Sequence, residues 1–246
     1  MPNMHDFILC QAYFTKSGTR SPLYAGLDAE MFLNNYFQLS AAVRLTFCAF
    51  AAHDLSNETL AISYYKRARK ALARKPFIKP SLELVQTYTC LFHFAINKGQ
   101  PVIALQFLRS GLQSIRELKL DVDPDDSPWL YSLNLSERRK EERRRTFWQI
   151  FWHWSWQRAL SDEDIIDFPI TSVNVKPPSQ VFDPLPIFPV NAVKNWECCI
   201  LNLMGDIKRR YMIPPRRILD LLASEDQISL GMHLVSTQSS IPARFC

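Results

Sequence analysis

Glycine is scarce in this sequence, at 6 of 246 residues, and its scarcity narrows the chemistry that the chain can carry. Phosphate-binding loops and tightly turning all-β folds depend on glycine, because only glycine adopts positive φ without strain. The motifs G-x-G-x-x-G, G-x-x-x-x-G-K-[ST], H-E-x-x-H and G-x-S-x-G are also missing. We therefore predict that the chain is not an enzyme. The remaining alternative is an all-α enzyme whose catalytic residues are distant in the sequence and come together only in the folded structure.

Long apolar stretches are missing too. No run of about 18 uninterrupted apolar residues occurs, so we expect no membrane-spanning helix and no membrane partner. Residues 1–7 are mostly polar and include Asp6, unlike the basic start and apolar centre of a secretory leader. These observations predict a soluble intracellular protein.

The cysteines lack the spacing of a common zinc site, because no two of the six form C-x-x-C. Cys90 and His93 share a helical face, but Cys48 and His53 lie about 140° apart around a helix, which is poor for a shared metal. We therefore expect reduced thiols and no metal or cofactor in this chain. An acidic group could imitate a calcium loop but lacks its glycine and terminal glutamate, so we interpret it as a solvated turn. This group comprises Asp162, Glu163, Asp164 and Asp167.

What the sequence does contain is enough apolar material for a large helical core. Hydrophobic residues make up 47% and aromatic residues 12%, while 29 Lys+Arg stand against 24 Asp+Glu. Apolar residues recur at helical spacing, and no alternation typical of strands is found. The predicted helices are 32–52, 58–74, 81–97, 101–118, 137–160 and 192–212, and a last short helix is expected to begin at 218–222. The short link before Pro101 predicts an antiparallel helix pair, and Gly111 in mid-helix predicts a close helix contact.

The predicted fold is all-α, a multi-helical domain of antiparallel helix pairs. Six of the 16 prolines fall between Pro169 and Pro189, which predicts an extended segment near residues 169–190. We expect a poorly defined N-terminal segment at 1–30, one helical domain over 31–223, and a frayed tail at 224–246.

Two basic stretches stand out. Residues 66–79 hold seven basic side chains and no acid, and residues 138–145 hold six basic side chains and two acids. They could be phosphate-binding surfaces or a nuclear-import signal, but solvated helix faces are the favoured interpretation. In the second stretch, Glu141 and Glu142 lie three or four residues from arginines and should pair with them.

A cluster of aromatic residues follows the second basic stretch. Core packing is the favoured interpretation of this cluster, and a ligand cavity lined by its tryptophans is the alternative. We predict that Trp148 and Phe151 lie in the core and that Arg138 and Arg139 are exposed.

Five segments in order give the chain a family resemblance. Residues 61–69, 80–86, 111–120, 135–148 and 162–169 resemble the fungal-specific transcription factor domain. That domain is the middle homology region of Zn₂Cys₆ binuclear-cluster regulators, and the match spans about residues 35–215. The positions that match the family's motifs are Tyr65, Arg67, Ala68, Gln86, Arg116, Arg143, Arg144, Arg145 and Trp148.

The sequence departs from the family pattern at the end of the long helix. Trp154 and Ser155 stand where the family usually has Asp-Arg, and residues 158–160 replace its Gly-Arg-Pro. The family's six-cysteine cluster has no counterpart in this sequence.

The resemblance implies a nuclear regulatory domain that modulates transcription by RNA polymerase II in response to a small-molecule effector or a protein partner. DNA binding, and zinc with it, would come only from a missing N-terminal cluster, and a dimer would form through segments not seen here. The alternative is a tetratricopeptide-like helical scaffold that binds a protein partner, although no 34-residue repeat recurs.

Overall fold

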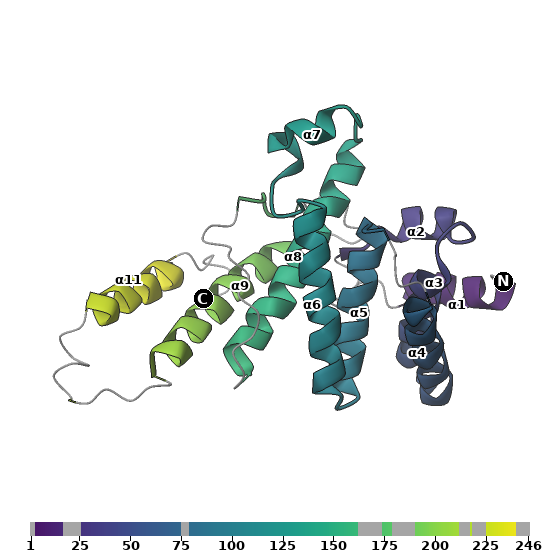
Figure 1. Ribbon diagram of the computed structural model, residues 1–246, viewed down its shortest axis with the longest axis horizontal. Helices are drawn as coiled ribbons and strands as arrows, with labels where there is room; N and C mark the ends of the chain where they lie inside the picture. Colours follow the sequence, from purple (N-terminus) through teal and green to yellow (C-terminus); the bar gives the residue numbers. More distant parts are fainter. Residues whose placement is uncertain are drawn as a thin grey trace. The chain divides into compact units, whose positions relative to one another are not determined.

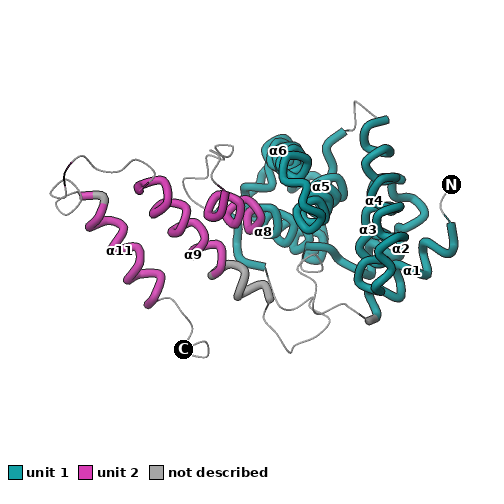
Figure 2. The backbone as a smooth tube through the Cα atoms, turned by 90° about the horizontal axis from the view of Figure 1, so that it is seen from below, with its two compact units in different colours: residues 1–150, 168–191 teal, residues 151–167, 192–246 magenta. Residues whose placement is uncertain are grey.

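Helices account for all the regular structure in the described part of the chain. The structure is a computed structural model and describes residues 3–16, 26–74, 79–161, 174–178, 190–211, 217 and 225–239. Over these residues the elements are α-helices and one short 3₁₀ turn, which confirms the predicted all-α fold. The chain divides into two compact units (Figure 2): residues 1–150 with 168–191, and residues 151–167 with 192–246.

The first unit is built mainly on helices α1 to α6 (Figure 1). Helix α3 packs against α1, α4 and α5, and α5 packs along α6. The core of the unit is formed by the apolar faces that these helices turn toward one another. Their bounds are α1 (Met4–Lys16), α2 (Ala29–Asn35), α3 (Ala41–Asp54), α4 (Glu58–Ala73), α5 (Leu82–Asn97) and α6 (Pro101–Glu117).

Helices α4 to α6 begin and end close to where the sequence predicts. Asn57 caps α4 by accepting from the Leu60 amide, and Ser81 caps α5 in the same way. Gly99 adopts φ +65° just after α5, a conformation that favours glycine, and Pro101 then opens α6.

The single helix predicted over residues 32–52 is in fact two helices. Ser40 has an extended backbone, with φ −63° and ψ 155°, and its hydroxyl accepts from the Val43 amide. A serine cap therefore starts α3 anew after the turn that ends α2. The continuous apolar pattern hid this break, because the residues on both sides of the turn are buried in the same core.

The described parts of the N-terminal segment, 3–16 and 26–30, differ from the expectation that residues 1–30 are poorly defined, and 17–25 lie outside the described residues. Helix α1 buries Cys10 and Tyr13, and the Cys10 sulfur lies 3.7 Å from that of Cys48 on α3. Tyr64 on α4 donates a hydrogen bond to the carboxylate of Asp6 at 2.5 Å. Helix α1 is thus part of the core of the first unit.

After α6 the chain forms short turns and then the longest described helix. These elements are the 3₁₀ turn η2 (Pro124–Asp126), α7 (Pro128–Tyr131) and α8 (Glu137–Leu160). The unit boundary falls within α8, between residues 150 and 151. Most of the segment expected to be extended near 169–190 lies outside the described residues, and 174–178 is the part that is described.

The second unit contains the end of α8 together with α9 and α11. Helix α9 spans Val190–Tyr211, close to the predicted 192–212. Helix α11 spans Glu225–Ser239, where a frayed tail was expected, although most of its described side chains are exposed. Among the described helices, none combines the length and the apolar character needed to cross a membrane.

Gly111 lies at the close helix contact that the sequence predicts. A Cβ atom at this position would lie 2.5 Å from Cδ1 of Ile150 on α8 and 3.4 Å from Cβ of Tyr88 on α5. The absence of a side chain therefore lets α6 approach both neighbours.

Replacing Gly111 by valine should overpack this contact. We expect Gly111→Val to lower the free energy of unfolding by about 1–3 kcal/mol, measured by urea denaturation followed by circular dichroism. Gly231→Val in α11 is the matched control, because a Cβ there meets nothing within 4 Å. Equal stability of the two variants would contradict the close contact.

Candidate functional site

The charged half of α8 (137–145) buries one of its faces in the first unit. Glu141, Glu142, Arg144 and Arg145 are each less than 9% exposed, although the sequence predicts a solvated face. That prediction is therefore wrong for these four residues. Burying so many charges is costly unless each meets a partner, so the partners explain the burial.

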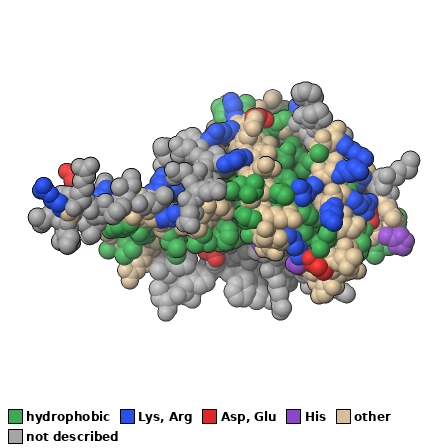
Figure 3. Space-filling view, turned by 60° about the horizontal axis from the view of Figure 1, so that its bottom comes forward, with side chains coloured by type: hydrophobic (Ala, Val, Ile, Leu, Met, Phe, Trp, Pro, Cys, Tyr) green, Lys and Arg blue, Asp and Glu red, His purple; other side chains and the backbone are tan. Residues whose placement is uncertain are grey.

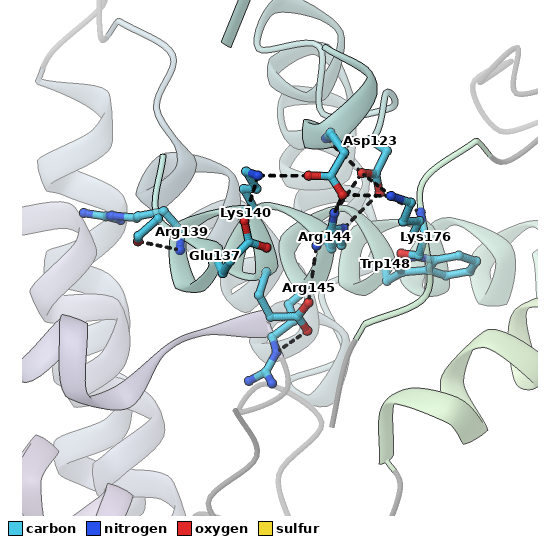
Figure 4. A network of polar contacts seen from close by, with 11 residues as sticks. Asp123, Glu137, Arg139, Lys140, Arg144, Arg145, Trp148 and Lys176 are labelled. Carbon is cyan, nitrogen blue, oxygen red and sulfur yellow. Dashed lines mark hydrogen bonds and ion pairs between the residues drawn. The ribbon is translucent and has the colours of Figure 1, made fainter. Parts of the chain in front are cut away.

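Arg144 and Asp123 form the central pair of this network (Figure 4). Nε and Nη2 of Arg144 donate to the two carboxylate oxygens of Asp123 at 2.9 and 2.8 Å. Nη2 also reaches the carboxylate of Asp125 at 2.7 Å. The two-pronged geometry matches a guanidinium to a carboxylate, and Asp123 is completely buried.

The turn that carries Asp123 is also held by residues 174–178. The Lys176 amide donates to Asp123 at 2.9 Å, and the Lys176 ammonium lies 2.7 Å from the Asp125 carboxylate. Burial opposes ionisation of Asp123, but the Arg144 guanidinium and the amides of Asp125 and Lys176 outweigh it and hold its pKa below the usual value. The Lys176 and Lys140 ammonium groups likewise lower the pKa of Asp125.

A second pair joins the start of α8 to the cap of α2. Arg138 donates to both carboxylate oxygens of Asp28, one of them at 2.7 Å, and also reaches Glu30. Burial raises the pKa of Asp28, but the hydrogen bonds from Arg138 and the Met31 amide more than compensate, and the net shift is downward.

Arg138 and Arg139, which were predicted to be exposed, are intermediate between exposed and buried. Their side chains are 37% and 38% exposed, and both are ion-paired. Arg139 binds Glu142 at 2.7 Å.

Gln86 on α5 connects to the same helix from another side. Its amide nitrogen donates to Thr146 at 3.1 Å, to Glu142 at 3.3 Å and to the Gly26 carbonyl at 3.1 Å. Burial raises the pKa of Glu142, and the nearby Arg139 offsets only part of that effect.

The remaining motif positions on α8 also face inward. Arg145 donates to Glu141 at 3.1 Å, as the predicted intrahelical pairing requires, and Arg143 donates to the Leu118 carbonyl at 3.0 Å. Burial lowers the pKa of Arg143. Trp148 and Phe151 are 5% and 4% exposed, which confirms their predicted core positions, and the Trp148 indole donates to the Lys176 carbonyl at 2.9 Å.

The other motif positions lie on α4 and α6, away from these contacts. The Tyr65 ring is buried and stacks on Phe94 of α5, with ring centres 4.7 Å apart. Ala68 is fully buried, and Arg67 is exposed with its guanidinium over the Tyr64 ring. Arg116 is exposed near the end of α6. The motif residues therefore form several packing contacts and not one site.

The network fits a structural role better than a chemical one. Each of its five principal acids lies within 3.1 Å of a basic side chain, so their charges are already balanced. These pairs are Asp28–Arg138, Asp123–Arg144, Asp125–Arg144, Glu141–Arg145 and Glu142–Arg139. Among the described residues, no group of three His, Cys, Asp or Glu side chains is arranged to hold a metal ion.

Of the residues considered for a metal, Cys48 and His53 have different partners in the structure. His53 lies 3.1 Å from Glu58, whereas Cys48 contacts Cys10 and the Tyr36 hydroxyl. The Cys90 sulfur is buried on α5. The acidic group at 162–167 lies outside the described residues.

Sequence reasoning missed the partners that α8 uses. Asp28, Asp123, Asp125 and Lys176 come from segments that the periodicity analysis interprets as loops. One signal was available: the acidic run 123–126 complements the basic run 138–145 in charge. The sequence alone did not show that the two runs meet.

Comparison with known proteins identified no similar protein or family. No family model matches the chain, and no curated protein or solved structure shows significant similarity to it.

Removing Arg144 should leave a buried and unpaired Asp123. We expect Arg144→Met to cost about 3–5 kcal/mol in the free energy of unfolding, measured by urea denaturation. Arg143→Met is the matched control, because Arg143 donates to a carbonyl and should cost only about 0.5–1.5 kcal/mol. The double variant Asp123→Asn/Arg144→Met should cost less than the sum of its parts, and strict additivity would argue against the pair.

The same carboxylates should make the first unit sensitive to acid. Because the pKa values of Asp28, Asp123 and Asp125 are lowered by folding, their stabilisation is present above the unfolded value of about 4. It is lost as the pH falls through the lower folded values. Glu142, whose pKa is raised by burial, has the opposite effect: its protonation in acid removes a destabilising contribution to the folded state.

We expect the difference in unfolding free energy between pH 7 and pH 3 to shrink in Asp123→Asn. Asp126→Asn is the control, because Asp126 is exposed on the same turn and forms no ion pair among the described residues. Urea titrations at both pH values provide the measurement. An unchanged difference in Asp123→Asn would show that Asp123 does not carry the acid response.

Proposed function

We propose that this chain is the regulatory domain of a fungal-type transcription factor. In this function it modulates transcription by RNA polymerase II in the nucleus in response to a ligand or partner. Contact with DNA comes from a zinc cluster that is not part of this sequence. The chain itself performs no catalysis and requires no cofactor.

The observation that carries the proposal is that separate segments of the resemblance meet around one helix. Gln86, from the second segment, bonds to Glu142 and Thr146 in the fourth. Arg143, also from the fourth, donates to the carbonyl of Leu118 in the third. Three of the five ordered segments thus belong to one packed unit, which supports treating them as one domain pattern and not as chance matches.

The departures from the family pattern lie in the second unit. Trp154 and Ser155, which replace the family's charged pair, are buried. Arg158 forms an ion pair with Asp206 on α9 at 2.5 Å. The residues in this region therefore supply different contacts, so we base the proposal on the first unit.

A reporter assay tests the proposal. The full chain is inserted between an unrelated DNA-binding domain and an activation domain in a fungal reporter strain. We expect reporter output to differ by at least about five-fold from that of a flexible spacer of equal length, in at least one nutrient condition. A ligand shifts a domain between two states only if it binds them with different affinities, so the output should depend on the nutrient condition.

Two variants distinguish regulation by the folded domain from the effect of inserting a protein of this size. Arg144→Met weakens the fold and should return output toward that of the spacer, whereas Arg109→Gln, at an exposed position of α6 that matches no family motif, should leave regulation intact. Output equal to that of the spacer under every condition, with a folded chain, would overturn the proposal. It would favour the helical scaffold that binds a protein partner.

A further inference from the structure

A groove in the first unit combines a basic wall with an apolar wall. It has a volume of about 620 Å³, within the range of small-molecule sites, and lies between α4 and α6 with Tyr88 of α5 beside it. Its lining from α4 is Lys66, Arg69, Lys70, Leu72 and Ala73. From α6 the lining is Ile103, Gln106, Phe107 and Ser110.

Helical spacing explains why these residues share the groove. Residues 66, 69, 70 and 73 follow the i, i+3, i+4, i+7 pattern on α4, and 103, 106, 107 and 110 repeat it on α6. Each helix therefore presents one continuous face. The face of α4 is basic, and that of α6 is apolar with two polar side chains.

The basic wall is not neutralised within the described part of the chain. Lys66, Arg69 and Lys70 form no ion pair there, in contrast to Arg138, Arg139, Arg144 and Arg145 of α8, and no lining residue is acidic. The Arg69 guanidinium lies over the Tyr65 ring, 5.4 Å from its centre. Glu117, which acts electrostatically on Tyr88, does not line the groove.

The apolar wall is aromatic and half-buried. The Tyr88 and Phe107 rings stack with their centres 6.5 Å apart and their planes at 28°. Figure 3 shows the same contrast on the surface: Lys and Arg side chains gather over α4, beside hydrophobic side chains over α5 and α6. Such a surface suits a ligand with one charged end and one apolar end.

We propose that this groove binds a small organic anion with an aromatic or branched apolar body and one carboxylate, phosphate or sulfonate group. The anionic group lies among Lys66, Arg69 and Lys70, and the body packs on Tyr88, Ile103 and Phe107. The role of this groove as the effector site of a regulator rests on the proposed function. Binding itself depends only on the groove and is measured without transcription.

Two probes of equal ring structure test the two walls. The purified full chain is titrated with 8-anilinonaphthalene-1-sulfonate and with N-phenyl-1-naphthylamine, which lacks the sulfonate, and probe emission is recorded. We expect one site per chain, with the sulfonate bound at least about five-fold more tightly than the neutral compound. Inorganic phosphate, which has no apolar body, should not displace the sulfonate at millimolar concentration.

Matched variants locate the site. Lys66→Gln/Lys70→Gln should weaken sulfonate binding by about five-fold and leave the neutral probe unaffected. Arg67→Gln/Arg109→Gln removes the same net charge from exposed positions outside the groove and should change neither affinity. Ser110→Phe fills the groove while keeping its cations and should weaken both probes. Circular dichroism checks that each variant is folded.

Three results would overturn the inference. The first is an equal loss of sulfonate affinity in the two double variants. The second is unchanged probe binding in Ser110→Phe, and the third is equal affinity of the unaltered chain for the two probes. Failure of the proposed function is seen separately, because the reporter then stays at the spacer level while the probe still binds. Conversely, a regulated reporter with no probe binding rejects this groove alone.

Discussion

Asp123 is fully buried, and a buried carboxylate needs positively charged or hydrogen-bond-donating groups in direct contact with it. Moving an ion of this size out of water costs several kcal/mol even after relaxation, and only close, well-oriented donors offset that cost. Arg144 supplies two of them, and the amides of Asp125 and Lys176 supply two more. Compared with a well-packed apolar pair of similar volume, such an ion pair adds little net stability, but it holds α8 against the turn at 123–126.

The rest of the first unit repeats this constraint with other partners. Arg138 fixes the start of α8 to the cap of α2, and Gln86 fixes its next turn to α5. Each partner comes from a different segment of the chain, so the charged half of α8 is the place where segments distant in sequence are brought into register. Apolar packing fills the space around it, through Phe147, Trp148 and Ile150.

The sequence predicts the helices well where caps and periodicity agree, as in α4, α5 and α6. Prediction from the sequence fails where the structure of a segment depends on contacts with residues far away in the chain. The stripe at 32–52 looks continuous because both α2 and α3 face the core, and α1 looks weak because its anchors, Cys48 and Tyr64, lie far along the chain. The charged network was missed for the same reason: nine consecutive charged residues look solvated until their partners are known. Pairing within α8 was predictable, because Glu141 and Arg145 are four residues apart, whereas pairing with Asp28 or Asp123 depends on the tertiary fold.

The aromatic half of α8 has a spectroscopic consequence. Four of the six tryptophans lie on this one helix, at positions 148, 152, 154 and 156. The indole of Trp148 donates to Lys176 in the first unit, whereas that of Trp152 donates to Glu197 in the second, at 2.8 Å. The intrinsic fluorescence of the chain is therefore dominated by α8, and tryptophans a single turn apart sense different halves of the molecule. Two variants, one that keeps Trp148 and one that keeps Trp152 as the single tryptophan, would each report the melting of one unit on its own.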